Sequence, residues 1–403
     1  MTAHPPAAVK ASPPSAPTPK VRLLYIDNLR IVLISMVVLL HLAITYGAEG
    51  DWFYNEQVPE NIASDVALTL YTMIAQAFTL AFFMLIASYL NPPAYDRKGP
   101  GAFVKDKLKR LGIPTLLFWA VLNPLLVMMI RALEGEPPIP PGVSLPSFWA
   151  HATNVGPMWF VELLLILSLL YALWRLATAG RAKPQRSSET FEVSTSSSAA
   201  PGNGAMALFA LVVGLITFVV RLAWPVDRWL EPLHFQLAQH PQYIAYFLAG
   251  IYAYRHNGFA GVRIAQAKLW LWVAVGLILS YPVIVVLSGA LEKGVEEFKG
   301  GLTWQSALYS VWEQFLCLAI IVALLVWFRE RFNRQGMLAA AMGADTYAVY
   351  FIHPAVIIPL AYALSGIYLV GLVKWVLVAP LALALCFLVA HLLRKLPGLR
   401  AVL

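Results

Sequence analysis

The chain has 403 residues, of which 60% are hydrophobic and 12% are charged, and its mean hydropathy is +0.69. Because an ordinary globular domain has about 25% charged residues, this composition excludes a water-soluble protein. The net charge of +8 comes from basic residues in short loops between apolar runs, which is typical of membrane topology and argues against a nucleic-acid partner. Cys317 and Cys386 both lie inside apolar runs, so neither a disulfide framework nor a metal site is expected.

We therefore predict an all-α, polytopic membrane protein, because a helix satisfies its own backbone polar groups in lipid. The Pro- and Ala-rich residues 1–20 lack the apolar core of a signal peptide and are expected to form a disordered cytosolic tail. One transmembrane domain is expected at 21–396, with a low-complexity cytosolic loop at 180–204 and a short tail at 397–403. Apolar runs of about 20 residues predict a bundle of about ten spans, at 24–47, 64–90, 109–130, 157–178, 205–223, 241–255, 267–290, 304–328, 343–363 and 367–393.

Lys and Arg divide 22 to 5 between the two sides of these spans. The basic-rich side comprises the N-terminal tail, 91–110, 175–204, 255–268, 329–334 and the C-terminus. The loops of the opposite side carry mainly acidic residues. Because Lys and Arg accumulate in cytoplasmic loops, both termini are expected in the cytosol, with the bundle in the inner (plasma) membrane.

The first span carries three ionisable residues, Asp27, Arg30 and His41. Arg30 and His41 are eleven residues apart, which at 100° each is about three turns, so they share one face of the helix. Asp27 lies one turn from Arg30 on nearly the same side. Ionisable groups in a span usually face a pathway or an active site, although a buried histidine can also be bonded to another helix. Arg30 could equally pair with Asp27 or extend to the interface.

Later spans contain further polar candidates. Glu162 follows Trp159 by three residues in an apolar run, and Glu313 lies about two turns into its own span. Each carboxylate requires a partner, either a structural hydrogen bond or a bound substrate. His353, directly before Pro354, is interpreted as structural rather than chemical. Aromatics and amides around 224–240 suit a sugar, but aromatics also gather at membrane interfaces.

Several segments together resemble the acyltransferase-3 family of membrane-bound acyltransferases, including its glucan-biosynthesis type. The first span resembles the family's Arg-x10-His signature, and 82–89 resembles its second-helix motif, with Ala87-Ser88 where Ser-Gly is usual. Further matching segments, in order, are Arg110 to Pro114, Pro157 to Leu164, Pro241 to Gly258 and Thr346 to Pro354. The resemblance runs from residue 24 to about 360.

The resemblance implies transfer of an acyl group from acyl-CoA, such as acetyl-CoA or succinyl-CoA, to a hydroxyl of a glycan or other extracytoplasmic acceptor. His41 would act as general base, since a neutral imidazole can take a proton from a hydroxyl. Arg30 would belong to the acyl-CoA path, with Asp27 orienting it. No permanently bound cofactor or metal is implied. The phosphates of CoA suit basic groups, for which the candidates are Lys107, Lys109 and Arg110, and the acceptor candidates are Trp159, Glu162, Glu313 and His353.

Two other functions remain open at this point. The buried charges of Arg30, His41, Glu162 and Glu313 could form the path of a proton-coupled transporter. Alternatively, they could serve only structure in a flippase-like partner or scaffold for polysaccharide export. No repeat at a fixed period is visible, which disfavours an inverted-repeat transporter.

Overall fold

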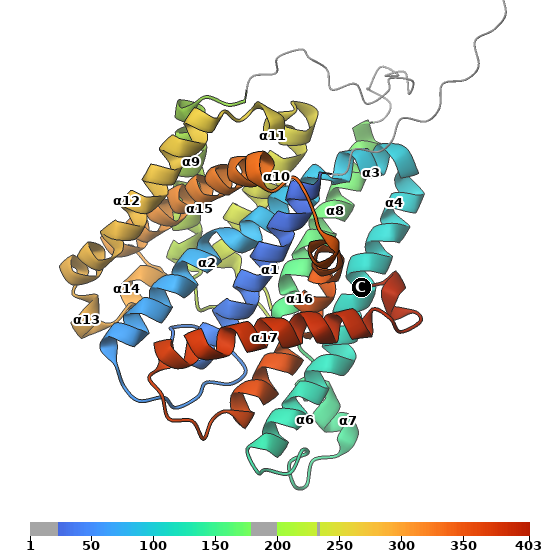
Figure 1. The fold of residues 1–403 in the computed structure, drawn as a ribbon, viewed down its shortest axis with the longest axis vertical. Coiled ribbons are helices and arrows are strands. Elements are labelled where there is room, and N and C mark those ends of the chain that lie inside the picture. The colour runs from blue at the N-terminus through green and yellow to red at the C-terminus, as the bar shows by residue number, and fades with distance from the viewer. Residues whose placement is uncertain (1–22, 179–199, 232–233) are drawn as a thin grey trace, which may run out of the picture.

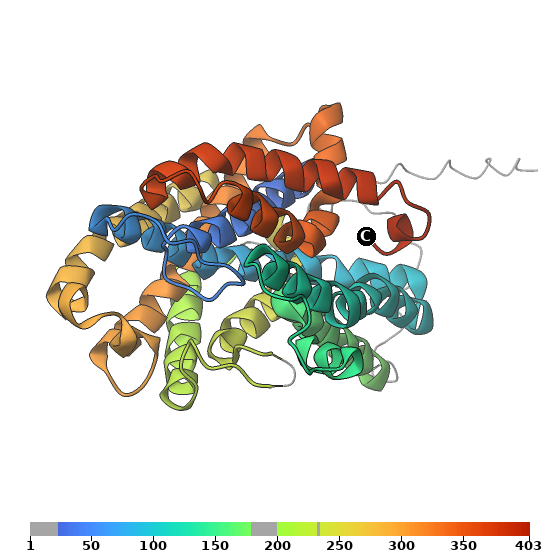
Figure 2. The same cartoon turned by 90° about the horizontal axis from the view of Figure 1, so that it is seen from below.

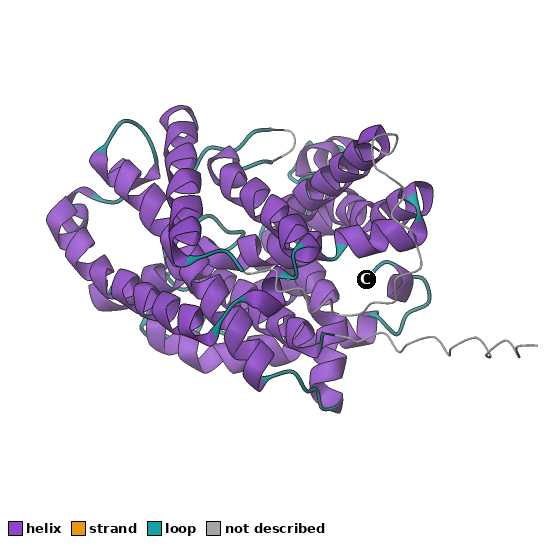
Figure 3. Cartoon of the chain, turned by 90° about the horizontal axis from the view of Figure 1, so that it is seen from above, coloured by secondary structure: helices purple, strands orange, loops and turns teal. Residues whose placement is uncertain are grey.

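The computed structural model describes residues 23–178, 200–231 and 234–403. The predicted tail 1–20 and most of the predicted loop 180–204 lie outside these residues. The described parts are almost entirely helices and loops (Figure 3), with one isolated β-bridge between Leu230 and Phe235. The prediction of an all-α polytopic membrane protein is confirmed.

Nine helical segments of the described chain are long and apolar enough to cross a bilayer. They are α1 (Leu24–Thr45), α2 (Ile62–Tyr89) continued by α3 (Asn91–Lys98), the segment Pro100–Leu133, α8 (Trp159–Thr178) with the preceding turn Gly156–Met158, α9 (Asn203–Ala223), α12 (Ile264–Ser288), α15 (Trp304–Arg331), α16 (Met337–Ala363) and α17 (Gly371–Leu393). The predicted span at 241–255 corresponds to α10 (His240–Arg255), a shorter helix of 16 residues. The other short helices are α7 (Leu145–Ala152), α11 (Gly258–Gly261), α13 (Ala290–Lys293) and α14 (Glu296–Lys299), with 3-10 turns at Leu237–Gln239 and Leu399–Ala401.

The segment Pro100–Leu133 is irregular. It consists of α4 (Pro100–Lys107), a π-helical turn (Leu108–Gly112), α5 (Ile113–Leu117), a second π-helical turn (Phe118–Leu122) and α6 (Asn123–Leu133). Pro114 and Pro124 each stand at the second residue of the α-helix that follows a π-turn. Proline has no N–H to donate and its ring crowds the preceding turn, and a wider turn accommodates both effects.

Helix α1 lies at the centre of the bundle and contacts α2, α15, α16 and α17. Its residues Leu29, Leu33, Val38 and Leu42 are completely buried. In Figure 1, α9, α12 and α15 form one side of the molecule, and α4 and α8 form the other. Figure 2 shows that α17, in red, runs along one long face, opposite α9 in light green.

Helix α10 packs closely against α2 at a glycine. A Cβ at Gly250 would overlap Ser88 Oγ and Leu85 O, so only glycine allows this approach. In the second-helix motif, Ala87-Ser88 stands where Ser-Gly is usual, so Ser88 occupies the position of the usual glycine. The space for this close approach is provided instead by Gly250 of the neighbouring helix α10.

The two ends of the bundle differ in the segments that they carry. In Figure 1, α3 and α11 lie at one end, whereas α6, α7, α13 and α14 lie at the other. The first end carries the loops rich in Lys and Arg, and the second carries the acidic loops. We call them the basic end and the acidic end.

Candidate active site

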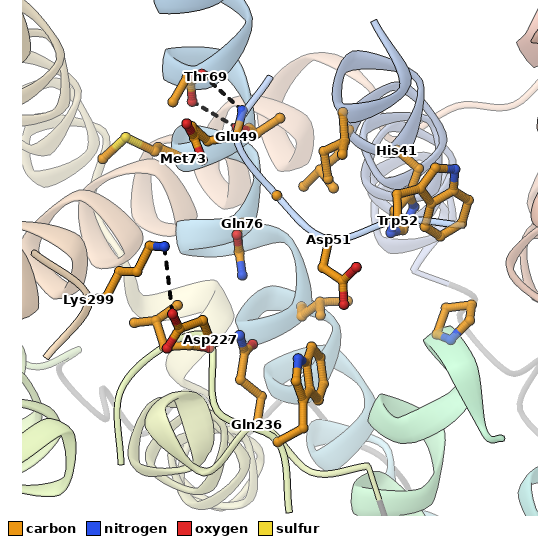
Figure 4. A pocket seen from close by; sticks show the side chains of 18 of the residues that line it. His41, Glu49, Asp51, Trp52, Thr69, Met73, Gln76, Asp227, Gln236 and Lys299 are labelled. Atoms are coloured by element: carbon orange, nitrogen blue, oxygen red, sulfur yellow. Dashed lines mark hydrogen bonds and ion pairs between the residues drawn. The ribbon is translucent and has the colours of Figure 1, made fainter. Parts of the chain in front are cut away.

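A cavity of about 910 Å³ opens among α1, α2, α8 and the loops of the acidic end. We call it the aromatic cavity. Its volume is typical of a site for a small organic molecule. His41 lies in its wall, close to Trp52 of the loop 46–61, as Figure 4 shows. Its remaining aromatic side chains are Phe53, Trp159, Trp229, Tyr281, Phe298, Tyr309, Trp312 and Tyr350.

His41 is held in a stack of three rings. Its centroid lies 3.8 Å from that of Trp52 and 5.0 Å from that of His353, with interplanar angles of 23° and 24°. His353 Nδ1 lies 2.7 Å from Tyr350 O, which assigns a proton to this nitrogen and leaves Nε2 as an acceptor. His41 Nδ1 is buried and makes no hydrogen bond to the described residues. Stacking therefore fixes the plane of the imidazole.

A buried ion pair fixes the loop that carries Trp52. Lys374 of α17 donates to Glu56 and to the carbonyl oxygens of Leu364, at 2.7 Å, and Ile367, at 3.0 Å. The two charged side chains are only 1% and 6% exposed. The backbone N–H of Glu56 also donates to Thr45 O at the end of α1, at 2.8 Å. Both contacts tie the loop to the helices around His41.

Sequence reasoning missed this pair. The only signal was Lys374 itself, a lysine inside the apolar run 367–393, where an unexplained charge calls for a partner.

The charged residues that line the aromatic cavity are mostly acidic. Glu49, Asp51 and Asp227 line it together with a single lysine, Lys299. Lys299 lies 3.6 Å from Asp227 and also pairs with Glu296. The hydrogen bond to Glu296 raises the pKa of Lys299, so its ammonium stays charged and is already engaged by two carboxylates. Within the described chain, no ion pair is formed by Glu49 or Asp51, and Asp51 projects into the cavity in Figure 4.

The predicted segment 224–240, with its aromatics and amides, contributes some of its residues to the aromatic cavity. Trp229, His234 and Gln236 line the aromatic cavity, and the rings of Trp229 and His234 stack with centroids 4.2 Å apart. Trp224 and His240, which sequence analysis had grouped with them, are not in its lining.

A second cavity, of about 720 Å³, opens toward the basic end. We call it the basic cavity. Among the described residues, Asp106 is the only Asp or Glu in its lining, and it pairs with Lys98 at 2.8 Å and with Arg110 at 3.3 Å. Lys107 donates to Asn91 at 2.6 Å. The basic side chains of its lining are Arg30, Arg97, Lys98, Lys107, Arg110, Arg394 and Arg400.

Arg30 and His41 lie in different cavities on one helix. Along α1, Arg30 and Ile34 line the basic cavity, whereas Val37 and His41 line the aromatic cavity. Arg30 donates to Thr346 Oγ1 at 3.0 Å and lies 3.5 Å from Asp27, as the spacing in the sequence had suggested. The predicted shared face therefore exists, and it passes from one cavity to the other.

Tyr350 of α16 belongs to the walls of both cavities. Its hydroxyl donates to Pro157 O in the turn before α8. After this turn, Trp159 lines the aromatic cavity and Phe160 lines the basic cavity. Tyr350 and this turn form the partition between the two spaces.

The structure brings some of the predicted site residues together and leaves others apart. His353 stacks on His41 but is not in the lining of the aromatic cavity, and Lys109 is not in the lining of the basic one. Glu313 lies in neither lining; it is fully buried in a 2.6 Å ion pair with Arg221, which is also fully buried. Glu162 also lies in neither lining, and its buried Oε2 has no hydrogen-bond partner in the described chain.

These features define a polytopic membrane protein with two cavities of different charge and a histidine in the wall of one of them. A model of the acyltransferase-3 family, described as "Acyltransferase domain", matches residues 23–391. The chain therefore belongs to this family.

Curated relatives support the same family. The chain is similar to "Glucans biosynthesis protein C" of Escherichia coli (strain SMS-3-5 / SECEC), with 24% identity over 156 residues. The protein of the same name from Escherichia coli O157:H7 (strain EC4115 / EHEC) is 23% identical over 156 residues. Each match covers 38% of this chain and 39% of the relative, so it spans less than half of either protein. No solved structure matches the chain.

Proposed function

We propose that the protein transfers an acyl group from acyl-CoA, bound in the basic cavity, to a hydroxyl of a glycan or similar acceptor in the aromatic cavity. His41 acts as general base. The observation that carries this proposal is the single α1 face on which Arg30 lines one cavity and His41 the other. A donor and an acceptor bound in these cavities would meet beside His41.

The basic cavity suits the phosphates of CoA. Seven basic side chains face one carboxylate in its lining, and guanidinium groups bind phosphate in a bidentate manner. The eleven residues from Arg30 to His41 span roughly 16 Å along the helix, a distance suited to the long pantetheine arm. The arm would pass the partition at Tyr350 and present the thioester at His41.

The aromatic cavity suits a hydroxyl-rich acceptor. Aromatic faces accept the apolar faces of sugars, and carboxylates and amides such as Asp51 and Gln236 accept or donate hydrogen bonds to hydroxyls. The printed name of the similar relatives, "Glucans biosynthesis protein C", agrees with a glycan acceptor.

The chemistry requires one proton transfer at His41. A ring nitrogen takes the proton of the acceptor hydroxyl while the oxygen attacks the thioester carbonyl. The tetrahedral intermediate collapses, the new ester forms, and CoA leaves as a thiolate that takes up the proton. Trp52 and His353 hold the ring plane during these steps. General bases of this kind contribute about 10²- to 10⁴-fold in rate.

The membrane orientation belongs to the same proposal. With the basic end in the cytosol, the basic cavity faces the cytosolic acyl-CoA pool, both termini are cytosolic, and the aromatic cavity opens outside the inner membrane. Cysteines introduced at Lys105, in α4, and at Glu296, in α14, test this. A membrane-impermeant maleimide added to intact cells should label only the Glu296 site; labelling of the Lys105 site instead would reverse the orientation.

Release of free CoA tests the reaction directly. The purified protein in detergent is given acyl-CoA with and without a glucan acceptor, and free thiol and acylated glycan are both measured. Transfer predicts that CoA release depends on the acceptor and equals the ester formed. CoA release without ester formation would show a hydrolase, and no release at all would contradict the proposal.

The placement of the buried charges also bears on the transporter alternative. A continuous proton path would bring Arg30, His41, Glu162 and Glu313 together. Of these four, only Arg30 and His41 line the two cavities, while Glu313 is held by Arg221. This arrangement favours the acyltransferase.

A further inference from the structure

The stretch of α1 between the two cavities is apolar. On α1, Ile34 and Val37 separate Arg30 from His41. Further apolar residues line both cavities: Phe160 and Leu164 of α8 line the basic cavity, and Leu80 of α2 lines the aromatic cavity. A charged group crossing this stretch would lose its hydration without meeting a cation, and an unpaired buried charge is strongly disfavoured.

The direction of entry decides which part of the donor crosses. If CoA enters from the basic cavity, its acyl group leads. Once the thioester carbonyl lies beside His41, the rest of the acyl chain extends beyond it into the aromatic cavity, away from Arg30.

The far side of His41 carries negative charge. Glu49 and Asp51 precede Trp52 in the loop that stacks on His41, and Asp227 lies across the cavity. Against these three carboxylates, the part of the chain that the structure describes contributes a single Lys or Arg to the lining, Lys299, which already pairs with Asp227 and Glu296. A second anion in this space would be repelled, and no uncommitted lysine or arginine in the lining could compensate for it.

We infer that the transferred acyl group is uncharged, such as acetyl or another short monocarboxylic acyl group, and that acyl groups with a free carboxylate, such as succinyl, are selected against. This inference rests on the proposed function, because it assumes that acyl-CoA enters through the basic cavity. It assigns a selectivity role to Glu49 and Asp51, which act on the acyl group through charge.

Three acyl-CoA donors distinguish the effect of the charge of the acyl group from the effect of its size. Acetyl-CoA is short and uncharged, butyryl-CoA carries an uncharged four-carbon chain, and succinyl-CoA carries a four-carbon chain that ends in a carboxylate. The measured quantity is kcat/KM for acceptor-dependent CoA release with each donor, on purified full-length protein. We expect a value for succinyl-CoA at least about tenfold below that for butyryl-CoA. A kcat/KM for succinyl-CoA equal to or above that for butyryl-CoA would overturn the inference. Equally low values for butyryl-CoA and succinyl-CoA beside a high value for acetyl-CoA would also overturn it, because the size of the acyl group alone would then determine selectivity.

Removing the charges tests their role. In the double variant Glu49→Gln/Asp51→Asn, the preference for butyryl-CoA over succinyl-CoA should fall several-fold. If the double variant is not monodisperse, Asp51→Asn alone provides the same comparison. The matched control is Glu134→Gln, since Glu134 is an exposed acid near the acidic end that does not line the aromatic cavity.

The outcomes separate this inference from the proposed function. A preference that falls in the double variant and persists in Glu134→Gln supports the inference. A preference that persists unchanged in both variants overturns it while leaving the acyltransferase activity in place. Failure of every donor to release CoA overturns the proposed function and this inference with it.

Discussion

Two regions of the bundle bury ionisable side chains in different ways. Around α1 and α16, Arg30 and His41 line cavities. Around α9 and α15, Arg221 and Glu313 are fully buried and bonded to each other, with Ser310 and Gln239 as additional hydrogen-bond partners. We therefore expect a charge in a span to serve chemistry when it borders a cavity, and to serve structure when it is paired away from both cavities.

The largest expected effect lies in the first region. His41→Ala should lower acyl transfer by about 10²- to 10⁴-fold because it removes the proposed base, while expression and membrane insertion remain normal. Turnover with acyl-CoA and a glucan acceptor, on protein checked by size-exclusion chromatography, measures this. Near-normal turnover in a well-folded variant would remove His41 from the mechanism.

The second region should respond in stability instead. Glu313→Leu leaves the Arg221 guanidinium buried without its carboxylate, which commonly costs about 3–5 kcal/mol. We expect a marked loss of thermal stability in detergent, with the kcat of the remaining folded protein close to that of the wild type.

The replacement of both partners, Arg221→Met/Glu313→Leu, should recover much of that stability, because no uncompensated charge remains. A large fall in kcat that the double replacement does not reverse would assign Glu313 to the reaction and break the contrast between the two regions.

The pair Glu56–Lys374 provides an intermediate case. Like Arg221–Glu313 it is buried, but it fixes the loop that places Trp52 on His41. Lys374→Met should therefore lower kcat more than it raises either KM, in addition to lowering stability. Lys374→Arg, which keeps the charge, should recover part of kcat. A loss of stability as large as that expected for the Arg221–Glu313 pair, with unchanged kcat, would show that the Glu56–Lys374 pair serves only the stability of the fold.

The smallest effect is expected at the edge of the basic cavity. Arg110→Ala should raise the KM for acyl-CoA only a few-fold and leave the acceptor KM nearly unchanged, because the Arg110 side chain is 68% exposed. A contact equally strong in ground and transition states changes KM rather than kcat. Lys109→Ala is the matched control, since Lys109 does not line the cavity. A shift in the acceptor KM alone would contradict the donor assignment.

What could be predicted from sequence depended on how local each feature is. The common face of Arg30 and His41 follows from the geometry of one helix, and the spans follow from apolar runs, so both were accessible. The Glu56–Lys374 pair joins residues 318 positions apart, and the stack of Trp52 on His41 depends on the path of a loop. Glu313 had the same sequence signal as His41, a polar residue in an apolar span. Only the packing of α9 against α15 distinguishes its closed pair from a site.

The contact between Tyr350 and Pro157 bears on the energy supply of the cell. An energised membrane sustains its proton-motive force only while it resists ion leakage, and two aqueous cavities that open toward opposite ends of one bundle bring that resistance down to a thin layer. The phenol ring and its hydrogen bond to a backbone carbonyl lie in that layer. If the protein transfers an acyl group across the bilayer as proposed, this partition must let one slender chain through while remaining closed to protons.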